Sequence, residues 1–541
     1  MTRKLLVTSA LPYANGDIHL GHLLEHIQTD IFVRFQNLIG NEAVYLCADD
    51  AHGTAIMISA EKQDRSPEEY IEEVRENHIR DLTGFGVNYG EYYSTHSPEN
   101  EALSQEFFLA AKEKGAIHAE DVSQYYCESR GMFLADRQVK GTCPSCGAED
   151  QYGDSCEQCF ATYRATELIN PYSVFSNETP VIKSSKHLFF KVSQFTEVIQ
   201  DWLAKDTVNP ELKGKVNEWF DAGLKDWDIS RDAPYFGFEI PGETDKYFYV
   251  WLDAPVGYVA TTQKWAEKAG KDWNAIWKPG EYEIHHFIGK DILYFHTLFW
   301  PAMLHAAEYQ LPTKVNVHGF ITVNGEKMSK SRGTFITAKH YLDCLDPELL
   351  RYYYATKLSG TVDDMDLNLE DFMFRVNSDL VNKLLNIGSR LGKILQRDLG
   401  NKVSEHDADG ATLIAQFDAA VSGICDSYEN LQTNKAMNQI IELAEAANKY
   451  IHDKEPWNLI KEDEAAAQAV CTAGINALRR LAILLSPVIP QICEKIYRFL
   501  NIEGSPQLSD FGSDLHNTEI QPYEHILKRL KPEDVDQLIQ C

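Results

Sequence analysis

Four clustered cysteines have the spacing of a metal site. Cys143 and Cys146 form one C-x-x-C pair, and Cys156 and Cys159 form a second pair shortly afterwards. Two such turns can bring four thiolates around one Zn²⁺ in tetrahedral geometry. We therefore predict one zinc ion in a closed, structural site, with an open catalytic zinc as the alternative. A redox role is disfavoured, because one redox pair would not need a second pair beside it.

A pair of histidines has the character of a polyphosphate site. His19 and His22 flank Gly21 at the start of an expected helix, where free N–H groups and a partial positive charge favour anions. Gly21 lets a ligand approach the backbone closely, and two imidazoles can donate hydrogen bonds to phosphate oxygens. The alternative is a chance H-x-x-H pair, since neither a Walker lysine loop nor a G-x-G-x-x-G sequence accompanies it.

A basic loop lies between Gly325 and Gly333. It carries Lys327, Lys330 and Arg332 within six residues. Two ammonium groups on such a loop can hold the β- and γ-phosphates of a nucleotide while charge builds on leaving pyrophosphate. The alternative is an ordinary solvated basic loop.

The elements that must position these residues follow an α/β pattern. Residues 4–12 form an apolar strand, residues 19–35 keep helical spacing, and residues 41–50 form a second strand. A strand, helix and strand in this order predict a parallel sheet.

The rest of the chain predicts several domains. Residues 116–230 interrupt the α/β pattern with the cysteine cluster and short strand-like pieces, and the pattern resumes near Tyr247 and Ile284. From about residue 366 the pattern is helical. We predict an α/β fold with a split Rossmann-type domain (1–115 and 231–320), a zinc-knuckle insertion (116–230), a linker with the basic loop (321–365) and an α-helical bundle (366–541).

Composition limits the class of protein. The 541 residues are 44% hydrophobic and 24% charged, as in soluble globular proteins, and no apolar run reaches the ~18 residues that span a membrane. Thr8, Ser9 and Pro12 interrupt the apolar N-terminal stretch, which we interpret as a buried strand rather than a signal peptide. We expect a cytoplasmic protein without membrane contact. The net charge of −30 argues against non-specific binding of nucleic acid, although a local basic face remains compatible with it.

Together these motifs resemble the class I aminoacyl-tRNA synthetases. The sequence His19-Leu-Gly-His22 looks like their HIGH motif, and Lys327-Met-Ser-Lys-Ser331 matches their KMSKS motif in full. Four other segments resemble the methionyl-tRNA synthetase family, and so does the four-cysteine insertion. These segments are Ala10–Gly16, Cys47–Thr54, Val250–Tyr258 and Phe287–His296.

The resemblance implies a two-step reaction. Methionine attacks the α-phosphate of ATP, which binds with Mg²⁺, and the methionyl group then passes from the adenylate to the 3′-terminal ribose of initiator and elongator tRNA(Met). It implies that His19, His22, Lys327 and Lys330 are catalytic and that ATP also contacts Gly21, Gly289 and Asp291. The implied methionine site is Leu11, Tyr13, Asp50, Arg231, Trp251, Ala254, Pro255, Tyr258, Ile292 and His296.

Three alternatives remain open. For each aromatic residue taken alone, core packing is the simpler interpretation. The chain could belong to another class I synthetase family or to the small-molecule adenylyltransferases. It could also be a non-catalytic zinc protein that binds tRNA.

A helical projection of residues 381–399 predicts a surface for RNA. Lys383, Asn386, Arg390, Lys393 and Arg397 fall within a stripe of about 80°, opposite an apolar face. The resemblance implies that Asn386, Arg390, Pro456 and Trp457 read a CAU anticodon. The alternatives are a solvated basic face and a buried tryptophan. Some family members continue into a C-terminal module that dimerises them, and since the chain stops at Cys541 we expect a monomer.

Overall fold

The computed structural model describes residues 2–159, 161, 163–278, 280–328 and 334–539. Its centre is a five-stranded sheet in the order β14-β13-β1-β2-β3, in which all neighbouring strands are parallel. β1 is central and almost fully buried, so the loop that follows it leaves from the middle of the sheet. The strands are β1 (Lys4–Ser9), β2 (Glu42–Asp49), β3 (Glu91–Ser94), β13 (Tyr282–Gly289) and β14 (Lys314–His318).

The predicted strand–helix–strand unit is present, with a shorter first strand. β1 ends at Ser9, before Pro12, which lacks the N–H that a ladder needs. The following loop is held beside the end of β2, because Asp50 N–H donates to the Pro12 carbonyl and Ala14 N–H donates to the Asp50 carbonyl. The other elements of this part are α1 (Leu20–Leu38), α2 (Thr54–Lys62), α3 (Pro67–Gly84), α4 (Pro98–Glu113), α7 (Val250–Ala269), α8 (Asn274–Trp277), the π-helix η6 (Phe295–Phe299) and α9 (Trp300–Ala306).

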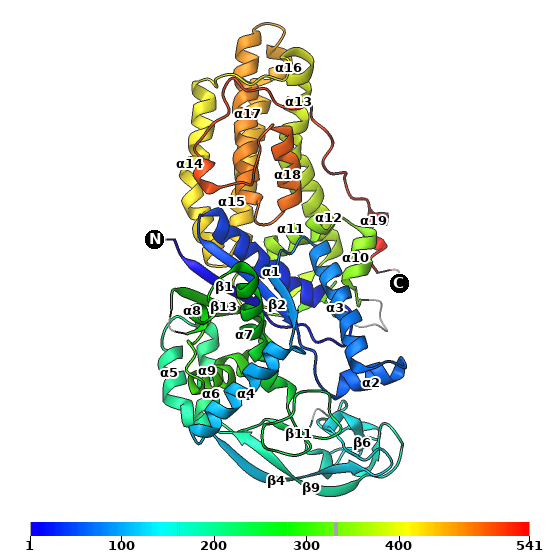
Figure 1. Ribbon diagram of the computed structural model, residues 1–541. Coiled ribbons are helices and arrows are strands. Elements are labelled where there is room, and N and C mark those ends of the chain that lie inside the picture. The colour runs from blue at the N-terminus through cyan, green and yellow to red at the C-terminus, as the bar shows by residue number, and fades with distance from the viewer. Residues whose placement is uncertain (1, 160, 162, 279, 329–333, 540–541) are drawn as a thin grey trace.

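An insertion follows α4 and leaves the parallel sheet (Figure 1). Its long hairpin pairs β4 with β9 in antiparallel register, and the small sheet β7-β6-β8 carries the cysteine turns at its edge. The elements are β4 (Ile117–Cys127), β5 (Met132–Phe133), β6 (Val139–Thr142), β7 (Gln151–Tyr152), β8 (Ile169–Ser173), β9 (Val181–Phe190), α5 (Thr196–Leu203), α6 (Lys213–Asp221), β10 (Trp227–Asp228), β11 (Ser230–Asp232) and β12 (Lys246–Phe248).

The segment that follows the parallel sheet has its own secondary structure. Strands β15 (Ile321–Val323), β16 (Glu326–Lys327) and β17 (Met365–Leu367) form a small sheet, with α10 (Ala338–Cys344) and α11 (Pro347–Lys357) between β16 and β17. The prediction of a linker therefore missed a folded unit, whose strands are only two or three residues long and too short to show a period of two.

A helical bundle completes the molecule and stands above the sheet in Figure 1. Its elements are α12 (Leu369–Arg375), the π-helix η8 (Val376–Leu385), α13 (Asn386–Asp398), α14 (Ala408–Glu429), α15 (Thr433–Lys454), α16 (Pro456–Leu459), α17 (Glu464–Leu485) and α18 (Pro490–Phe499), with the short α19 (Pro532–Asp536) near the C-terminus. In the described part of the chain, none of the helices is long and apolar enough to cross a membrane.

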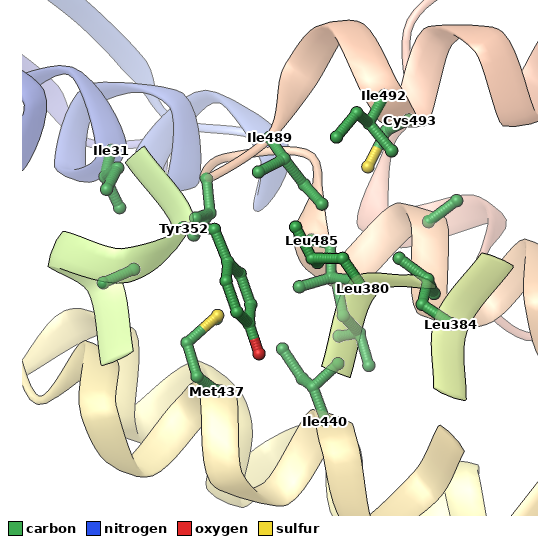
Figure 2. Close-up of a cluster of buried hydrophobic side chains, with 14 of the residues drawn as sticks. Ile31, Tyr352, Leu380, Leu384, Met437, Ile440, Leu485, Ile489, Ile492 and Cys493 are labelled. Carbon is green, nitrogen blue, oxygen red and sulfur yellow. The ribbon is translucent and has the colours of Figure 1, made fainter. Parts of the chain in front are cut away.

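The bundle and the sheet share one hydrophobic core. Figure 2 shows Ile31 of α1, Tyr352 of α11, Met437 of α15 and Ile489 after α17 in the same cluster of side chains. A buried ion pair reinforces this contact, because Arg351 Nη2 lies 2.7 Å from Asp30 Oδ2 of α1. Its Nε also donates to the Val488 carbonyl at the α17–α18 turn, at 2.7 Å. Packed side chains therefore join the bundle to the sheet.

Candidate active site

The two histidines after β1 are held as neutral hydrogen-bond donors. His19 is the N-cap of α1, and its Nδ1 accepts from the Gly21 N–H at 3.0 Å. His22 Nδ1 accepts from the His19 N–H at 3.3 Å, and the two rings stack with centroids 3.9 Å apart. Burial lowers the pKa of His19 to about 4, and burial together with the neighbouring histidines lowers the pKa of His22 well below its usual value. Each ring therefore carries its proton on Nε2, so both can donate to an anion.

These rings line a cavity of about 620 Å³, which we call the histidine cavity. It opens at the carboxyl end of β1. The strand order reverses here, because β2 follows on one side of β1 and β13 and β14 lie on the other, and ligands of parallel sheets usually bind in such a crevice. The other predicted ATP residues in its wall are Gly21, Gly289, Asp291 and Lys327, and Lys327 is exposed. The structure therefore brings Lys327, at the start of the basic loop, to the same cavity as the two histidines. Lys330 lies outside the described residues.

A second cavity of about 390 Å³, the apolar cavity, adjoins the first. Leu11, Tyr13 and Ile292 line both. Nine of the ten predicted methionine residues line the apolar cavity, which are Leu11, Tyr13, Asp50, Trp251, Ala254, Pro255, Tyr258, Ile292 and His296. Residues 250, 251, 254, 255 and 258 share one face of α7 because they recur at helical spacing.

His296 and Tyr258 form a fixed pair in the wall of the apolar cavity. His296 lies in the π-helix η6, and its Nδ1 is 3.1 Å from the Ile292 carbonyl, to which it must donate. Its Nε2 therefore accepts from the Tyr258 hydroxyl at 3.0 Å. Burial lowers the pKa of His296 to about 4, so the ring is neutral near pH 7. The wall thus presents polarisable groups without charge, which suits an apolar or thioether side chain.

Arg231 is the predicted methionine residue that does not line the apolar cavity. Its guanidinium carbon lies 3.8 Å from the centre of the Tyr249 ring, and its Nη1 is 3.2 Å from Asp228 Oδ2. It lines a separate polar cavity of about 430 Å³, whose wall comes from the insertion and from Thr54 of α2. The stack on Tyr249 holds the side chain next to the apolar cavity without entering it.

Several residues of the two cavities were not predicted from the sequence. Ala10, Val250 and Phe295 line the apolar cavity, and they are adjacent in sequence to predicted residues. Glu25 and His318 line the histidine cavity, with Glu25 Oε2 3.2 Å from His318 Nε2. Two signals could have found this pair, because Glu25 lies one helical turn after His22 and His318 ends a strand of the parallel sheet.

The four clustered cysteines converge as a metal site requires. Their sulfur atoms all lie within 4.8 Å of one another. The Cys143 and Cys159 sulfurs are 3.8 Å apart, and the Cys146 and Cys156 sulfurs are 3.6 Å apart. A tetrahedral zinc with Zn–S bonds of about 2.3 Å requires sulfur separations of about 3.8 Å. Although burial opposes it, N–H donors at Cys146 and Ser145 lower the pKa of Cys143 to about 6, which favours the thiolate that a metal binds.

Three of the predicted anticodon residues meet at the far end of the bundle. Asn386 and Arg390 lie one turn apart on α13, and the Arg390 guanidinium carbon is 4.6 Å from the centre of the Trp457 ring. Trp457 is half-buried, whereas Pro456 before it is buried as the first residue of α16. An aromatic ring beside a guanidinium offers a stacking surface for a base.

The basic stripe differs from its helical projection. That projection treats residues 381–399 as one α-helix, whereas a π-helix ends at Leu385 and α13 begins at Asn386. The wider π turns change the phase between Lys383 and the residues that follow. Lys383 also pairs with Asp379 and Glu445, and Arg397 pairs with Asp398, so the charge of the stripe is partly neutralised.

Comparison with known proteins identifies the family. A family model described as tRNA synthetases class I (M) matches residues 5–392, and one for the anticodon binding domain of methionyl tRNA ligase matches residues 401–521. The methionine–tRNA ligase of Thiobacillus denitrificans is 50% identical over 547 residues, covering 100% of this chain and 79% of that protein. The chain belongs to the class I methionyl-tRNA synthetases. The resemblance of its motifs and the predicted fold class are confirmed.

Solved structures of the family share this fold. Methionyl-tRNA synthetase of Mycobacterium tuberculosis in complex with methionyl-adenylate is 23% identical, with a TM-score of 0.81 over 97% of this chain and 99% of that chain. The apo form of the same enzyme gives a TM-score of 0.75 at 22% identity, over 98% of this chain and 99% of that chain. The family architecture of sheet, insertion and helical bundle therefore extends over nearly the whole chain.

Proposed function

We propose that this methionyl-tRNA synthetase activates L-methionine with ATP and transfers the methionyl group to tRNA(Met). The observation that carries this proposal is the contact between the two cavities. One is apolar and holds a half-buried carboxylate, Asp50, while the other is lined by two neutral imidazole donors. A methionine in the first would direct its carboxylate toward a nucleotide α-phosphate in the second.

The proposed chemistry is positioning and charge stabilisation. Asp50 would bind the α-ammonium, while Tyr258 and His296 would face the side chain. The Nε2 donors of His19 and His22 would stabilise the charge that builds on the α-phosphate, and Lys327 and Lys330 would hold the leaving pyrophosphate with its Mg²⁺. No covalent intermediate with the enzyme is needed, because adjacency and charge neutralisation account for much of such a reaction.

The assay that tests this function is ATP–pyrophosphate exchange with a panel of amino acids. We expect exchange with methionine and little with the others. Exchange with a different amino acid would indicate another class I specificity, and no exchange with any amino acid would indicate a non-catalytic tRNA-binding protein.

The four cysteines would hold a structural zinc ion. We predict that Cys146→Ser lowers the metal content from about one zinc per chain to near zero, since a closed Cys₄ site needs all four thiolates. The measurement is elemental analysis of the purified chain together with thiol titration. Cys425→Ser, in α14 of the bundle, is the matched control and should retain the metal. Freely titratable thiols at all four positions in the wild-type protein would contradict a zinc site.

The Tyr258–His296 pair provides a test of the apolar cavity. We predict that His296→Ala raises the KM for methionine about tenfold and changes the KM for ATP less than twofold, because only the methionine side of the joined cavities loses a wall. The measurement is ATP–pyrophosphate exchange at varied methionine and varied ATP. Tyr309→Phe removes another buried hydroxyl, bonded to Glu106 at 3.1 Å outside both cavities, and should change neither value. Equal changes in both KM values would remove His296 from the methionine site.

The surface around Trp457 would bind the CAU anticodon. The fold of the bundle and its match to an anticodon binding domain support this assignment, and the roles of Asn386, Arg390, Pro456 and Trp457 are part of the proposal. A monomeric state and a cytoplasmic location stay predictions.

A further inference from the structure

Three carboxylates gather at the apolar cavity. Asp49 and Asp253 are buried behind it and each has a histidine of its own, whereas Asp50 is half-buried. Asp49 Oδ1 lies 2.7 Å from His78 Nδ1 and accepts from the Tyr92 hydroxyl at 2.5 Å. Asp253, on α7, contacts His52 Nδ1. Asp50 directly follows Asp49 in the sequence. Each of the three carboxylates has one buried oxygen without a hydrogen-bond partner, which is Oδ1 in Asp50 and Asp253 and Oδ2 in Asp49. Asp50 is also the carboxylate that lines the apolar cavity.

His78 shows how such a pair is built. Its Nδ1 faces Asp49 and its Nε2 faces the Gly16 carbonyl at 2.7 Å, so both ring nitrogens must donate and the ring is an imidazolium. Despite the opposing effect of burial, the bond to Asp49 raises the pKa of His78. The charge of Asp49 is therefore neutralised inside the protein.

His52 has a comparable environment. It is fully buried, its Nδ1 faces Asp253, and its Nε2 is 3.0 Å from His96 Nδ1. His96 is half-buried, and burial together with His52 lowers its pKa, so its ring is neutral. The contact with Asp253 fixes one role for His52, because a carboxylate oxygen accepts and the Nδ1 of His52 must therefore donate. His52 thus holds the buried carboxylate of Asp253 by a hydrogen bond.

We propose that His52 is a positioning residue for methionine, because its hydrogen bond holds Asp253 away from the cavity and leaves Asp50 as the carboxylate that meets the α-ammonium. The inference rests on the proposed function of Asp50. His52 itself does not line the apolar cavity, and it acts through its two neighbours. Its own backbone N–H also faces Asp50, where it favours the ionised carboxylate.

The proposal predicts what happens when the histidine that binds Asp253 is removed. In His52→Gln, Asp253 becomes an unpaired buried carboxylate near Asp50, and repulsion disfavours the ionised form of Asp50. We expect the KM for methionine to rise about tenfold and the KM for ATP to change less than twofold. In the double variant His52→Gln/Asp253→Asn the unpaired charge is gone, so the KM for methionine should return to within about threefold of the wild-type value.

The pH dependence gives a readout that a structural defect would not move. Burial, followed by Asp253 and Asp49, raises the pKa of Asp50 well above its usual value. Methionine affinity should therefore fall as the pH drops through that pKa, since binding needs the carboxylate. The other titratable groups near Asp50 are the hydroxyls of Tyr13, Tyr249 and Tyr258, with Arg231 stacked on Tyr249. In His52→Gln the loss of methionine affinity should begin at a higher pH than in the wild-type protein. In the double variant it should begin at the wild-type pH again.

The experiment is ATP–pyrophosphate exchange over a pH series with the single and double variants, with melting temperatures to verify folding. Two competitive inhibitors locate the effect, because methioninol keeps the amine and 4-(methylthio)butyrate lacks it. We expect His52→Gln to weaken methioninol as much as methionine and to leave the butyrate unchanged. His406→Gln, which breaks a histidine–aspartate pair to Asp514 in the bundle, is the matched control and should leave the KM for methionine unchanged.

The outcomes separate the inference from the function on which it rests. Equal weakening of all three ligands by His52→Gln, or a double variant no better than the single one, would overturn the inference. If His52→Gln does not fold, the test uses His96→Gln, since the half-buried His96 ring contacts His52. This variant should raise the KM for methionine about threefold without changing butyrate inhibition. An unchanged KM for methionine would overturn the inference. A wild-type protein without methionine-dependent exchange would overturn the proposed function, and the inference with it.

Discussion

Replacing His19 with Asn is expected to slow methionyl-adenylate formation by about 100-fold or more while changing the KM for ATP less than threefold. The expectation follows from the two nitrogens of the ring, which have separate tasks. Nδ1 caps α1 by accepting from Gly21, and Nε2 carries the proton that is free to meet a phosphate. Asn supplies a good N-cap oxygen but has no donor at the Nε2 position. A single donor to a developing charge contributes about 10²–10³ in rate.

The same geometry provides controls. His22→Gln places an amide N–H near the position of Nε2 and should retain much more activity than His22→Ala. Because the pKa of His19 is about 4, its neutral form should persist from about pH 5 upward and be lost only as the pH falls through 4. Single-turnover rates at saturating ATP test these expectations. A His19→Asn enzyme with normal rates would show that Nε2 does not contact the transition state, and a large fall in its melting temperature would assign the effect to the cap.

Replacing Trp457 with Ala is expected to lower kcat/KM for charging of tRNA(Met) by about 100-fold and to leave ATP–pyrophosphate exchange unchanged. Stacking of a base on an aromatic ring contributes about 1–3 kcal/mol. Arg390 would also lose the ring on which its guanidinium lies, at 4.6 Å from the ring centre. The apolar cavity and the histidine cavity are on the other side of the shared core, so adenylate formation should not change when Trp457 is replaced.

A conservative variant distinguishes stacking from folding. Trp457→Phe keeps an aromatic face and should retain at least a tenth of the charging activity. Wild-type charging by Trp457→Ala would remove this residue from the RNA surface. Loss of both charging and exchange would indicate instead that the half-buried ring stabilises the bundle, against which it packs.

The sequence predicted the parts of the molecule that depend on local pattern. The strand–helix–strand order around His19, the insertion around Cys143 and the bundle after residue 366 all follow from apolar periodicity or cysteine spacing. The match of nine cavity residues had a different source, the resemblance of four segments to one family. Helical spacing explains why four of the nine share a face of α7, but spacing alone does not choose cavity over core.

Other features depend on contacts between distant segments, which no local pattern encodes. The tautomer of His296 is set by a carbonyl four residues away and by a hydroxyl on another helix. Arg231 lies outside the apolar cavity because it stacks on Tyr249 across a strand pair. The pairing of His52 with Asp253 spans 201 residues. The π-helix before Asn386 was also missed, because its ten residues carry apolar positions that an α-helix could equally use.

The shared core between sheet and bundle fixes the distance between the two parts of the molecule. Tyr352 and Ile489 lie in the cluster of Figure 2 and, with the Arg351–Asp30 pair, join α1 to the bundle. α1 begins at the histidines, and the bundle carries Trp457. The separation between the adenylate-forming groups and the RNA surface is therefore set by packed side chains. In the proposed reaction, an RNA is charged only if its own length between anticodon and 3′ end matches that separation, or bends to match it. The enzyme would thus measure the shape of its substrate as well as read three bases.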